Sequence, residues 1–334
     1  MKYLLLIPAF AVCACNAPKK TVTATAVNPE NYANTITSQE LKDHLYTFAS
    51  DEFEGRDTGE EGQKKAAQYI KNYYEKEAIG SPIAEGDYFQ EIPSAYFNNK
   101  YKDSENVIGF IKGKELPNEV VILTAHYDHV GKKGEEIYNG ADDDGSGSVA
   151  LLEIAEAFKK AVKDGYQPKR SVVFLHVTGE EKGLLGSKFY VENPIFPLAN
   201  TVANLNTDMI GRIDVKHEGK EDYIYLIGSD KLSTDLHNLS EEVNKKYVQL
   251  DIDYTYNDDN DPNRFYYRSD HYNFAKHNIP IIFYFNGVHA DYHKPTDTPE
   301  KINYDLLAKR TQLIFYTAWE IANRDQRIIV DKAK

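Results

Sequence analysis

Short apolar runs alternate with helix-like segments through the middle of this chain. The runs VVIL and VVFL lie within residues 119–128 and 171–181, and a helix-like segment from about residue 146 to 162 joins them. Because a strand with a continuous apolar run is buried on both faces, this pattern is typical of parallel strands covered by helices on either side. It predicts an α/β fold of three layers, α/β/α, with a twisted, mixed and mostly parallel central sheet.

The remaining periodic segments extend this pattern over most of the chain. Apolar runs predict further strands at residues 106–111, 201–209, 222–228 and 279–285. Helical periodicity predicts helices at residues 38–49, 59–76, 184–191 and 304–323, and another from about residue 232. A length of 334 residues suits one large α/β domain or two smaller ones. We expect a single domain over residues 38–334.

The amino terminus resembles an export signal followed by a tether. Residues 1–15 combine a positive start with an apolar run that is too short to span a bilayer. The segment from Val12 to Cys15 resembles a bacterial lipobox, in which Cys15 would be lipidated after cleavage; an ordinary core or disulfide cysteine is the alternative. Residues 16–37 are polar and lack apolar periodicity, as expected of a tether. These features predict an exported, lipid-anchored protein of the cell envelope, periplasmic or associated with the outer membrane, whose membrane contact is the anchor at Cys15.

Charge and cysteine content exclude several kinds of site. The net charge is -13, whereas a nucleic-acid-binding surface would need a basic patch. Cys13 and Cys15 are the two cysteines of the chain, so the mature domain has no internal disulfide, thiolate zinc site or cysteine nucleophile. A metal ion in this domain must therefore be bound by histidine, aspartate and glutamate.

Polar side chains that commonly bind metals follow the central strands of the expected sheet. They are His126 and Asp128, the triplet Asp142, Asp143 and Asp144, the pair Glu180 and Glu181, then Asp208, and finally His289, Asp291 and His293. Open α/β sheets bind ligands at the carboxyl ends of their strands. We therefore expect these side chains to converge on one edge of the sheet.

Spacing indicates how these residues divide their roles. His126 and Asp128 lie two residues apart on an extended chain and face the same side, so the carboxylate can orient the imidazole. Glu180 and Glu181 are adjacent and cannot point the same way, so one could bind a metal ion while the other addresses a water molecule. The aspartates at residues 142–144 need a cation or hydrogen-bond donors to offset their mutual repulsion.

Six motifs in order carry a family resemblance. HYDHVG, NGADDDGSG, TGEEKGLLGS, NTDMIGR, RSDHYNFAKHNIPIIFYF and DYHKPTDTPEKI resemble the successive motifs of metallopeptidase family 28, the double-zinc aminopeptidases. The earlier segment LYTFASDEFEGRDTGEEGQKKAAQYI is similar to that family's amino-terminal segment. The resemblance covers nearly the whole chain after the tether, and it implies the zinc aminopeptidase fold, which is phosphorylase/hydrolase-like.

The resemblance also implies two zinc ions per chain and a role for each site residue. Glu180 matches the general base, and Asp128 matches the carboxylate that orients a metal-binding histidine. Asp142 and Asp144 would bond loop amides or cap the following helix, where the helix dipole favours negative charge. The implied ligands are His126 and Asp208 for one zinc ion, Glu181 and His293 for the other, and Asp143 as a bridge between them.

The implied activity is hydrolysis of the amino-terminal peptide bond of peptides with a free N-terminus. A water molecule bridged by the two zinc ions would attack the carbonyl, with Glu180 as general base. Two alternatives on the same fold stay open: a glutaminyl-peptide cyclotransferase that uses one zinc ion, and a non-catalytic binding module. Metal stoichiometry separates the first of these from a two-zinc peptidase.

Several residues near these motifs have more than one interpretation. Residues 269–271 could contact the substrate or cap a helix. The acidic insert around residues 258–261 could bind calcium or be a solvated loop. Among the other histidines, we expect His176 in the sheet core, His217 at the surface, and His129 beside the site without being a ligand.

Overall fold

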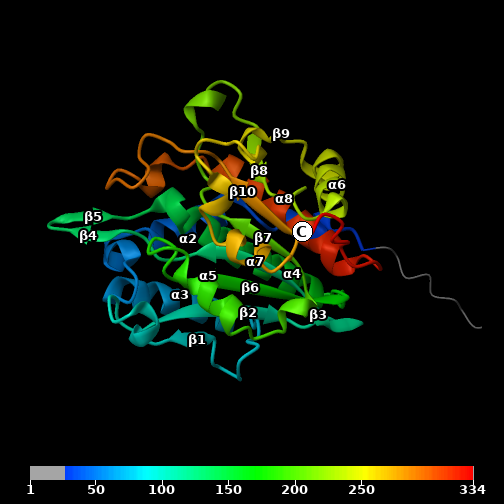
Figure 1. The fold of residues 1–334 in the computed structure, drawn as a ribbon, viewed down its shortest axis with the longest axis horizontal. Coiled ribbons are helices and arrows are strands. Elements are labelled where there is room, and N and C mark those ends of the chain that lie inside the picture. The colour runs from blue at the N-terminus through cyan, green and yellow to red at the C-terminus, as the bar shows by residue number, and fades with distance from the viewer. Residues whose placement is uncertain (1–26, 334) are drawn as a thin grey trace, which may run out of the picture.

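The computed structural model describes residues 27–333, and these form one mixed sheet between two layers of helices (Figure 1). The strands are β1 (Phe89–Ile92), β2 (Ser104–Ile111), β3 (Leu116–His126), β4 (Gly131–Lys133), β5 (Glu136–Tyr138), β6 (Arg170–Val177), β7 (Thr201–Thr207), β8 (Tyr223–Ile227), β9 (Asp251–Asp253) and β10 (Ile281–Phe285). The helices are α1 (Glu30–Ala33), α2 (Ser38–Phe48), α3 (Glu61–Lys76), α4 (Gly147–Lys163), α5 (Leu185–Glu192), α6 (Thr234–Val243), α7 (His271–Ala275) and α8 (Tyr304–Asn323).

The strands of the main sheet lie in the order β1-β2-β6-β3-β7-β10-β8-β9. The four central strands β6, β3, β7 and β10 are parallel, whereas β2 and β8 flank them in the antiparallel direction. Strands β4 and β5 form a separate antiparallel hairpin. The predicted mixed, mostly parallel sheet is therefore confirmed.

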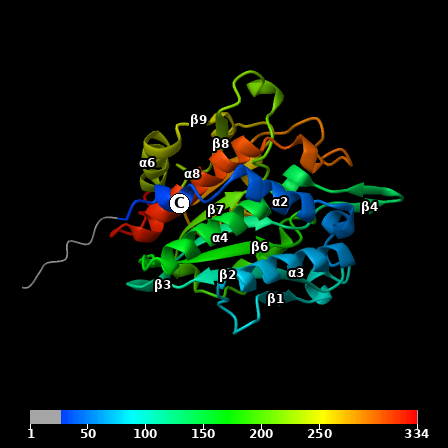
Figure 2. The same ribbon diagram turned by 180° about the vertical axis from the view of Figure 1, so that it is seen from behind.

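Side chains of the central strands alternate between two apolar layers. In β3, Val121 and Leu123 belong to the buried cluster that includes the apolar side chains of α2, α4 and α8. Their neighbours Val120 and Ile122 belong to a second buried cluster with Tyr190 of α5 and Phe274 of α7. Figure 1 looks onto the face that carries α5 and α7, and Figure 2 looks onto the opposite face with α2, α4 and α8. This burial on both faces explains the continuous apolar runs and confirms the three-layer α/β/α fold.

The folded domain begins before residue 38, where we expected the tether to end. Tyr32 and Ile36 are buried, and the Tyr32 ring stacks on Trp319 of α8 with centroids 5.6 Å apart. These two side chains supply apolar anchors in a segment that otherwise has a polar composition. The predicted signal segment and Cys15 lie outside the described residues. No helix within residues 27–333 is long and apolar enough to cross a membrane.

The parallel strands bring distant parts of the sequence to one edge of the sheet. β3 ends at His126, β7 ends immediately before Asp208, and β6 ends three residues before Glu180. The loop after β10 carries His293. Helix α4 starts at the same edge, directly after the irregular turn η3 (Ala141–Ser146). The expected convergence of the polar strand ends thus follows from the parallel arrangement.

Candidate metal centre

Asp143 is itself buried and lies at the centre of a cluster of histidines and carboxylates. Its Oδ1 lies 3.2 Å from Nε2 of His126, and its Oδ2 lies 3.0 Å from Nε2 of His293. The two oxygens of one carboxylate therefore face two different histidines. This is the arrangement that a carboxylate shared by two cations requires.

Each histidine faces a second carboxylate beside Asp143. Nε2 of His126 lies 3.6 Å from Oδ1 of Asp208, and Nε2 of His293 lies 3.2 Å from Oε1 of Glu181. Ligand atoms that lie about 2.0 to 2.1 Å from a tetrahedral zinc ion are about 3.3 Å from each other, so these spacings suit shared zinc ions. The structure brings together all five residues that the sequence motifs indicated as metal ligands.

Several of these side-chain atoms are buried without a hydrogen-bond partner in the described part of the chain. They include Nε2 of His126, Oδ2 of Asp143 and Oε1 of Glu181. A buried polar atom without a partner is costly unless something compensates it. Imidazole nitrogens and carboxylate oxygens that point at a common centre are the ligands that zinc accepts. The donor set therefore fits a metal ion.

The charges of the cluster favour a cation at its centre. Burial opposes protonation of His126, but Glu180, Asp143 and Asp208 raise the pKa of its imidazole well above the usual range. Burial is likewise outweighed at His293, where Asp143 and Glu181 raise the pKa to about 10. Burial would raise the pKa of Asp143, yet the surrounding histidines hold it well below its usual value. The carboxylates thus favour positive charge around them, which divalent ions can provide.

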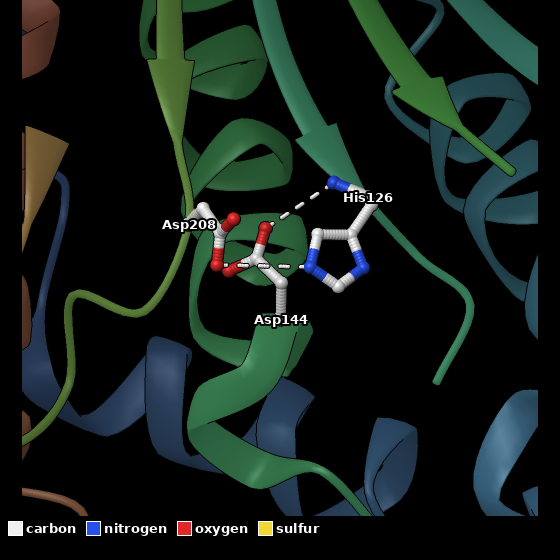
Figure 3. Close-up of side chains that lie close together, drawn as sticks. All are labelled: His126, Asp144 and Asp208. Atoms are coloured by element: carbon white, nitrogen blue, oxygen red, sulfur yellow. Dashed lines mark hydrogen bonds and ion pairs between the residues drawn. The ribbon is translucent and has the colours of Figure 1, made fainter. Parts of the chain in front are cut away.

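Asp144 also lies near His126 and Asp208, within reach of a common ion (Figure 3). Its oxygens, however, already accept hydrogen bonds from three backbone amides. The donors are the amides of His126 at 3.2 Å, Met209 at 3.1 Å and Gly147 at 2.9 Å. Asp144 therefore joins the ends of β3 and β7 to the start of α4. Of the two roles expected for Asp144, bonding loop amides or capping the helix, the structure shows the bonds to backbone amides.

The carboxylate of Asp142 is likewise engaged by hydrogen bonds with neighbouring residues. Its Oδ1 accepts the amide of Gly211 at 2.7 Å, and its Oδ2 lies 3.1 Å from Nε2 of His289. The backbone amides of Asp142 and Asp143 donate to Oδ2 of Asp297 at 3.0 and 3.2 Å. The peptide bond between Asp143 and Asp144 is cis. Of the three consecutive aspartates, only Asp143 directs its carboxylate at both His126 and His293.

Glu180 and Glu181 point in different directions, as their adjacency required. Glu180 lines a pocket beside the cluster, and no described side chain or amide donates a hydrogen bond to its carboxylate. Burial, together with the nearby negative charges of Asp208 and Asp270, raises its pKa well above the usual value. Glu181 instead faces the histidines, which lower its pKa to about 2 although burial opposes this.

Asp128 acts on its neighbours differently from the sequence prediction. The carbonyl oxygen of Asp128, at 3.0 Å, is the nearest acceptor for Nδ1 of His126, while the carboxylate lies 3.7 Å away. The carboxylate accepts hydrogen bonds from Thr58 Oγ1 at 2.9 Å and from the backbone amide of Glu180 at 3.1 Å. Residue 128 therefore orients the imidazole through its backbone and the Glu180 segment through its side chain.

We expected His129 beside the site and not in it, and we did not predict Asp297 or Arg56 as part of it. His129 is buried, and its Nδ1 lies 2.9 Å from Oε1 of Glu181, so it belongs to the cluster. Asp297 holds the amides of the aspartate triplet. Arg56 is buried and donates to the carbonyls of Tyr127 and Gly140, both at 2.8 Å. The only sequence signals were the positions of His129 and Asp297 within HYDHVG and PTDTPE.

The alternatives for residues 269–271 and for the acidic insert have structural answers. Ser269 donates a hydrogen bond of 2.6 Å to Oδ2 of Asp208, so it orients a candidate ligand and does not cap α7. Asp258 and Asp261 accept hydrogen bonds from the backbone amides two residues later. Within residues 27–333, the groups that could hold a metal ion all lie in the cluster around His126 and Asp143.

Comparison with known proteins identifies the family. Residues 106–318, well over half of the chain, match Peptidase family M28. The chain belongs to peptidase family M28. The matched residues carry the whole cluster described above, from β3 to the loop after β10.

Relatives of this M28 chain include several named peptidases. Leupeptin-inactivating enzyme 1 of Streptomyces exfoliatus is 28% identical over 337 residues, which cover 94% of this chain and 67% of that protein. Aminopeptidase YwaD of Bacillus subtilis is 36% identical over 110 residues, 32% of this chain and 22% of that protein. The probable glutamate carboxypeptidase LAMP1 of Arabidopsis thaliana is 40% identical over 105 residues, but the match spans only 14% of its length.

Solved structures show the same fold at low sequence identity. A zinc aminopeptidase from Bacillus subtilis superposes with a TM-score of 0.67 at 17% identity, covering 89% of this chain and 98% of that chain. An aminopeptidase from Aneurinibacillus sp. strain AM-1 gives a TM-score of 0.66 at 15% identity, covering 92% and 99%. These similarities establish the architecture of this M28 chain.

Proposed function

We propose that this M28 member is a zinc-dependent aminopeptidase that removes the first residue of peptides with a free N-terminus. One observation carries the proposal: the two oxygens of Asp143 face His126 on one side and His293 on the other. Asp208 lies beside His126, and Glu181 lies beside His293. The proposal of two zinc ions per chain rests on this paired geometry, and the family match supports the chemistry.

The residues around the cluster have separate roles in this proposal. Two bound zinc ions would activate a water molecule and polarise the scissile carbonyl. Glu180 faces the pocket with a carboxylate that no described donor engages, so it can accept the water proton and pass it to the leaving amine. The Asp128 carboxylate holds the backbone of Glu180 in place. The buried hydrogen bonds of Asp144 and Asp297 fix the turn that presents Asp143.

The activity is tested with a panel of aminoacyl-arylamides. Protein depleted of metal should be inactive, and added zinc should restore turnover of at least one member. Glu180→Gln, treated in the same way, is the control for contaminating peptidases, since it keeps the fold and lacks the basic carboxylate. If zinc restores no activity on any member, the proposal is wrong. A glutaminyl-peptide substrate in the panel detects cyclisation, the alternative that uses one zinc ion.

We also propose that Cys15 carries a lipid anchor that holds the enzyme at the cell envelope. The support is the lipobox-like sequence at residues 12–15, after an apolar run. Each buried CH₂ of an acyl chain contributes about 0.8 kcal/mol to membrane binding. Cys15→Ser should therefore abolish lipid labelling and move the protein to the soluble fraction. Wild-type protein that is already soluble and unlabelled in its native host would exclude the anchor.

A further inference from the structure

A pocket that is partly lined by phenylalanine rings opens directly beside the candidate metal centre. Its lining combines Glu180 and Asp208 of the cluster with Phe265, Phe283, Phe285 and Arg268. If Glu180 acts on a water molecule at the cluster, the reacting carbonyl lies next to this pocket. The side chain of the first substrate residue would then enter it.

Among residues 27–333, Arg268 is the one lysine or arginine that lines this pocket. Its guanidinium carbon lies 5.0 Å from the centroid of the Phe265 ring, and its side chain is solvent-exposed. Within residues 27–333, no carboxylate pairs with this guanidinium and no carbonyl accepts a hydrogen bond from it. Its donors are therefore available to a ligand that enters the pocket.

The position of Arg268 is tied to the metal cluster by the next residue. Ser269 donates a hydrogen bond of 2.6 Å to Oδ2 of Asp208, and it also accepts one of 2.9 Å from Asn206 in β7. Both Ser269 and Asn206 are buried. The backbone next to Arg268 is thus fixed relative to a candidate zinc ligand, so the side chain of Arg268 starts from a defined point beside the candidate metal centre.

We propose that Arg268 determines specificity by binding an acidic side chain of the first substrate residue. This inference rests on the proposed function and names its substrate class: peptides that begin with glutamate or aspartate. The methylene groups of such a residue would pack on the phenylalanine rings, and its carboxylate would pair with the guanidinium. A charge-assisted hydrogen bond is stronger than a neutral one, so this pair would add to the packing of the methylene groups on the rings.

Glutamyl and glutaminyl arylamides test the proposal, because the two first residues match in size and differ in charge. For zinc-restored wild-type protein, kcat/KM for the glutamyl substrate should exceed that for the glutaminyl substrate by about 10-fold or more. Arg268→Gln should reduce this ratio to about 1. Arg268→Glu should reverse the charge preference, so that a lysyl arylamide becomes better than the glutaminyl one.

Arg264 provides a matched control within the same loop. Its guanidinium carbon lies 4.9 Å from the centroid of the Tyr267 ring, and Arg264 is not part of the pocket lining. Arg264→Gln should leave the glutamyl-to-glutaminyl ratio unchanged. A wild-type ratio of 1 or below, or a ratio that Arg268→Gln leaves unaltered, would overturn the assignment.

Inhibitor binding separates this inference from the proposed function. The α-hydroxamates of glutamine and of glutamic acid carry the same metal-binding group and differ in the charge of the side chain, and both can be titrated into zinc-loaded protein. Tighter binding of the charged compound, lost in Arg268→Gln, supports the inference. Equal binding of both compounds overturns it. A wild-type protein that hydrolyses no arylamide refutes the proposed function, whereas turnover without charge preference refutes only the role of Arg268.

Discussion

The backbone amide of Glu180 donates a hydrogen bond of 3.1 Å to the buried carboxylate of Asp128. The carbonyl oxygen of Asp128 lies 3.0 Å from Nδ1 of His126 and accepts a hydrogen bond from it. Asp128 therefore connects a candidate zinc ligand to the candidate general base. Through these two hydrogen bonds, Asp128 links the position of His126 to the position of Glu180.

Asp128→Asn should lower activity while the protein stays folded. The substitution keeps the size of the side chain but places an amide NH₂ against Thr58 or the Glu180 amide, both of which are donors. Loss of such supporting contacts typically costs about 10- to 100-fold in activity or metal affinity. The measurement is kcat together with zinc content. Thr58→Val, which removes one of the two hydrogen bonds to Asp128, should have a smaller effect, and unchanged kcat in Asp128→Asn would contradict this role.

The adjacent glutamates should respond differently to the same substitution. Glu180→Gln should retain zinc and lower kcat by roughly 10² to 10⁴, the usual contribution of a general base. Glu181→Gln weakens a group that lies 3.2 Å from Nε2 of His293, so it should lower zinc occupancy and recover part of its activity in excess zinc. Zinc content and kcat are measured for both variants. The opposite pattern, in which only Glu180→Gln loses zinc, would show that the roles are exchanged.

His176 should make the fold sensitive to acid. It is buried in β6, its Nε2 lies 2.7 Å from the hydroxyl of Tyr74, and burial lowers its pKa to about 3. Because the folded-state pKa lies below that of the unfolded chain, the contribution of neutral His176 to stability is full above pH 6.5 and falls as the pH drops toward 3. Between pH 7 and 5 this amounts to about 2 kcal/mol of unfolding free energy.

His176→Phe isolates that contribution. Loss of the Tyr74 hydrogen bond destabilises the variant equally at both pH values, whereas its drop in unfolding free energy from pH 7 to 5 should be about 2 kcal/mol smaller than in the wild type. Denaturant unfolding of metal-depleted protein gives both values and removes the acid release of zinc from the comparison. Equal drops in the two proteins would show that His176 does not carry this sensitivity.

Local sequence patterns were sufficient to predict most of the fold. Helix α8 spans Tyr304–Asn323, the same residues that its periodicity indicated, because a long amphipathic segment needs no distant information. The earlier boundary near residue 30 was missed because it depends on the packing of Tyr32 against Trp319, far along the chain. His217, expected at the surface, is buried: its Nδ1 lies 2.7 Å from Asp214, and its ring stacks on Tyr223.

The candidate site, like the fold, could be predicted from the sequence only in part. The convergence of these side chains was predictable because each follows a strand or opens a helix at one edge of a parallel sheet, whereas the choice of five ligands among them was implied by the family resemblance. Arg56 and Asp297 were not, because they act by hydrogen bonds to backbone groups of loops far away in sequence. Such contacts leave no periodicity or spacing in the sequence. The choice of Asp143 among three consecutive aspartates came from the family resemblance, and the structure adds that Asp142 and Asp144 accept hydrogen bonds from backbone amides.

Zinc content per chain, measured in the wild type and in Asp143→Ala, tests the central claim most directly. Asp144→Ala is the matched comparison, because it removes a neighbouring buried carboxylate that binds backbone amides and should mainly cost stability, about 1 to 3 kcal/mol. The account predicts two zinc ions in the wild type, about two in folded Asp144→Ala, and loss of both zinc ions with most activity in Asp143→Ala. A single zinc ion in the active wild-type enzyme, or two retained in Asp143→Ala, would contradict it.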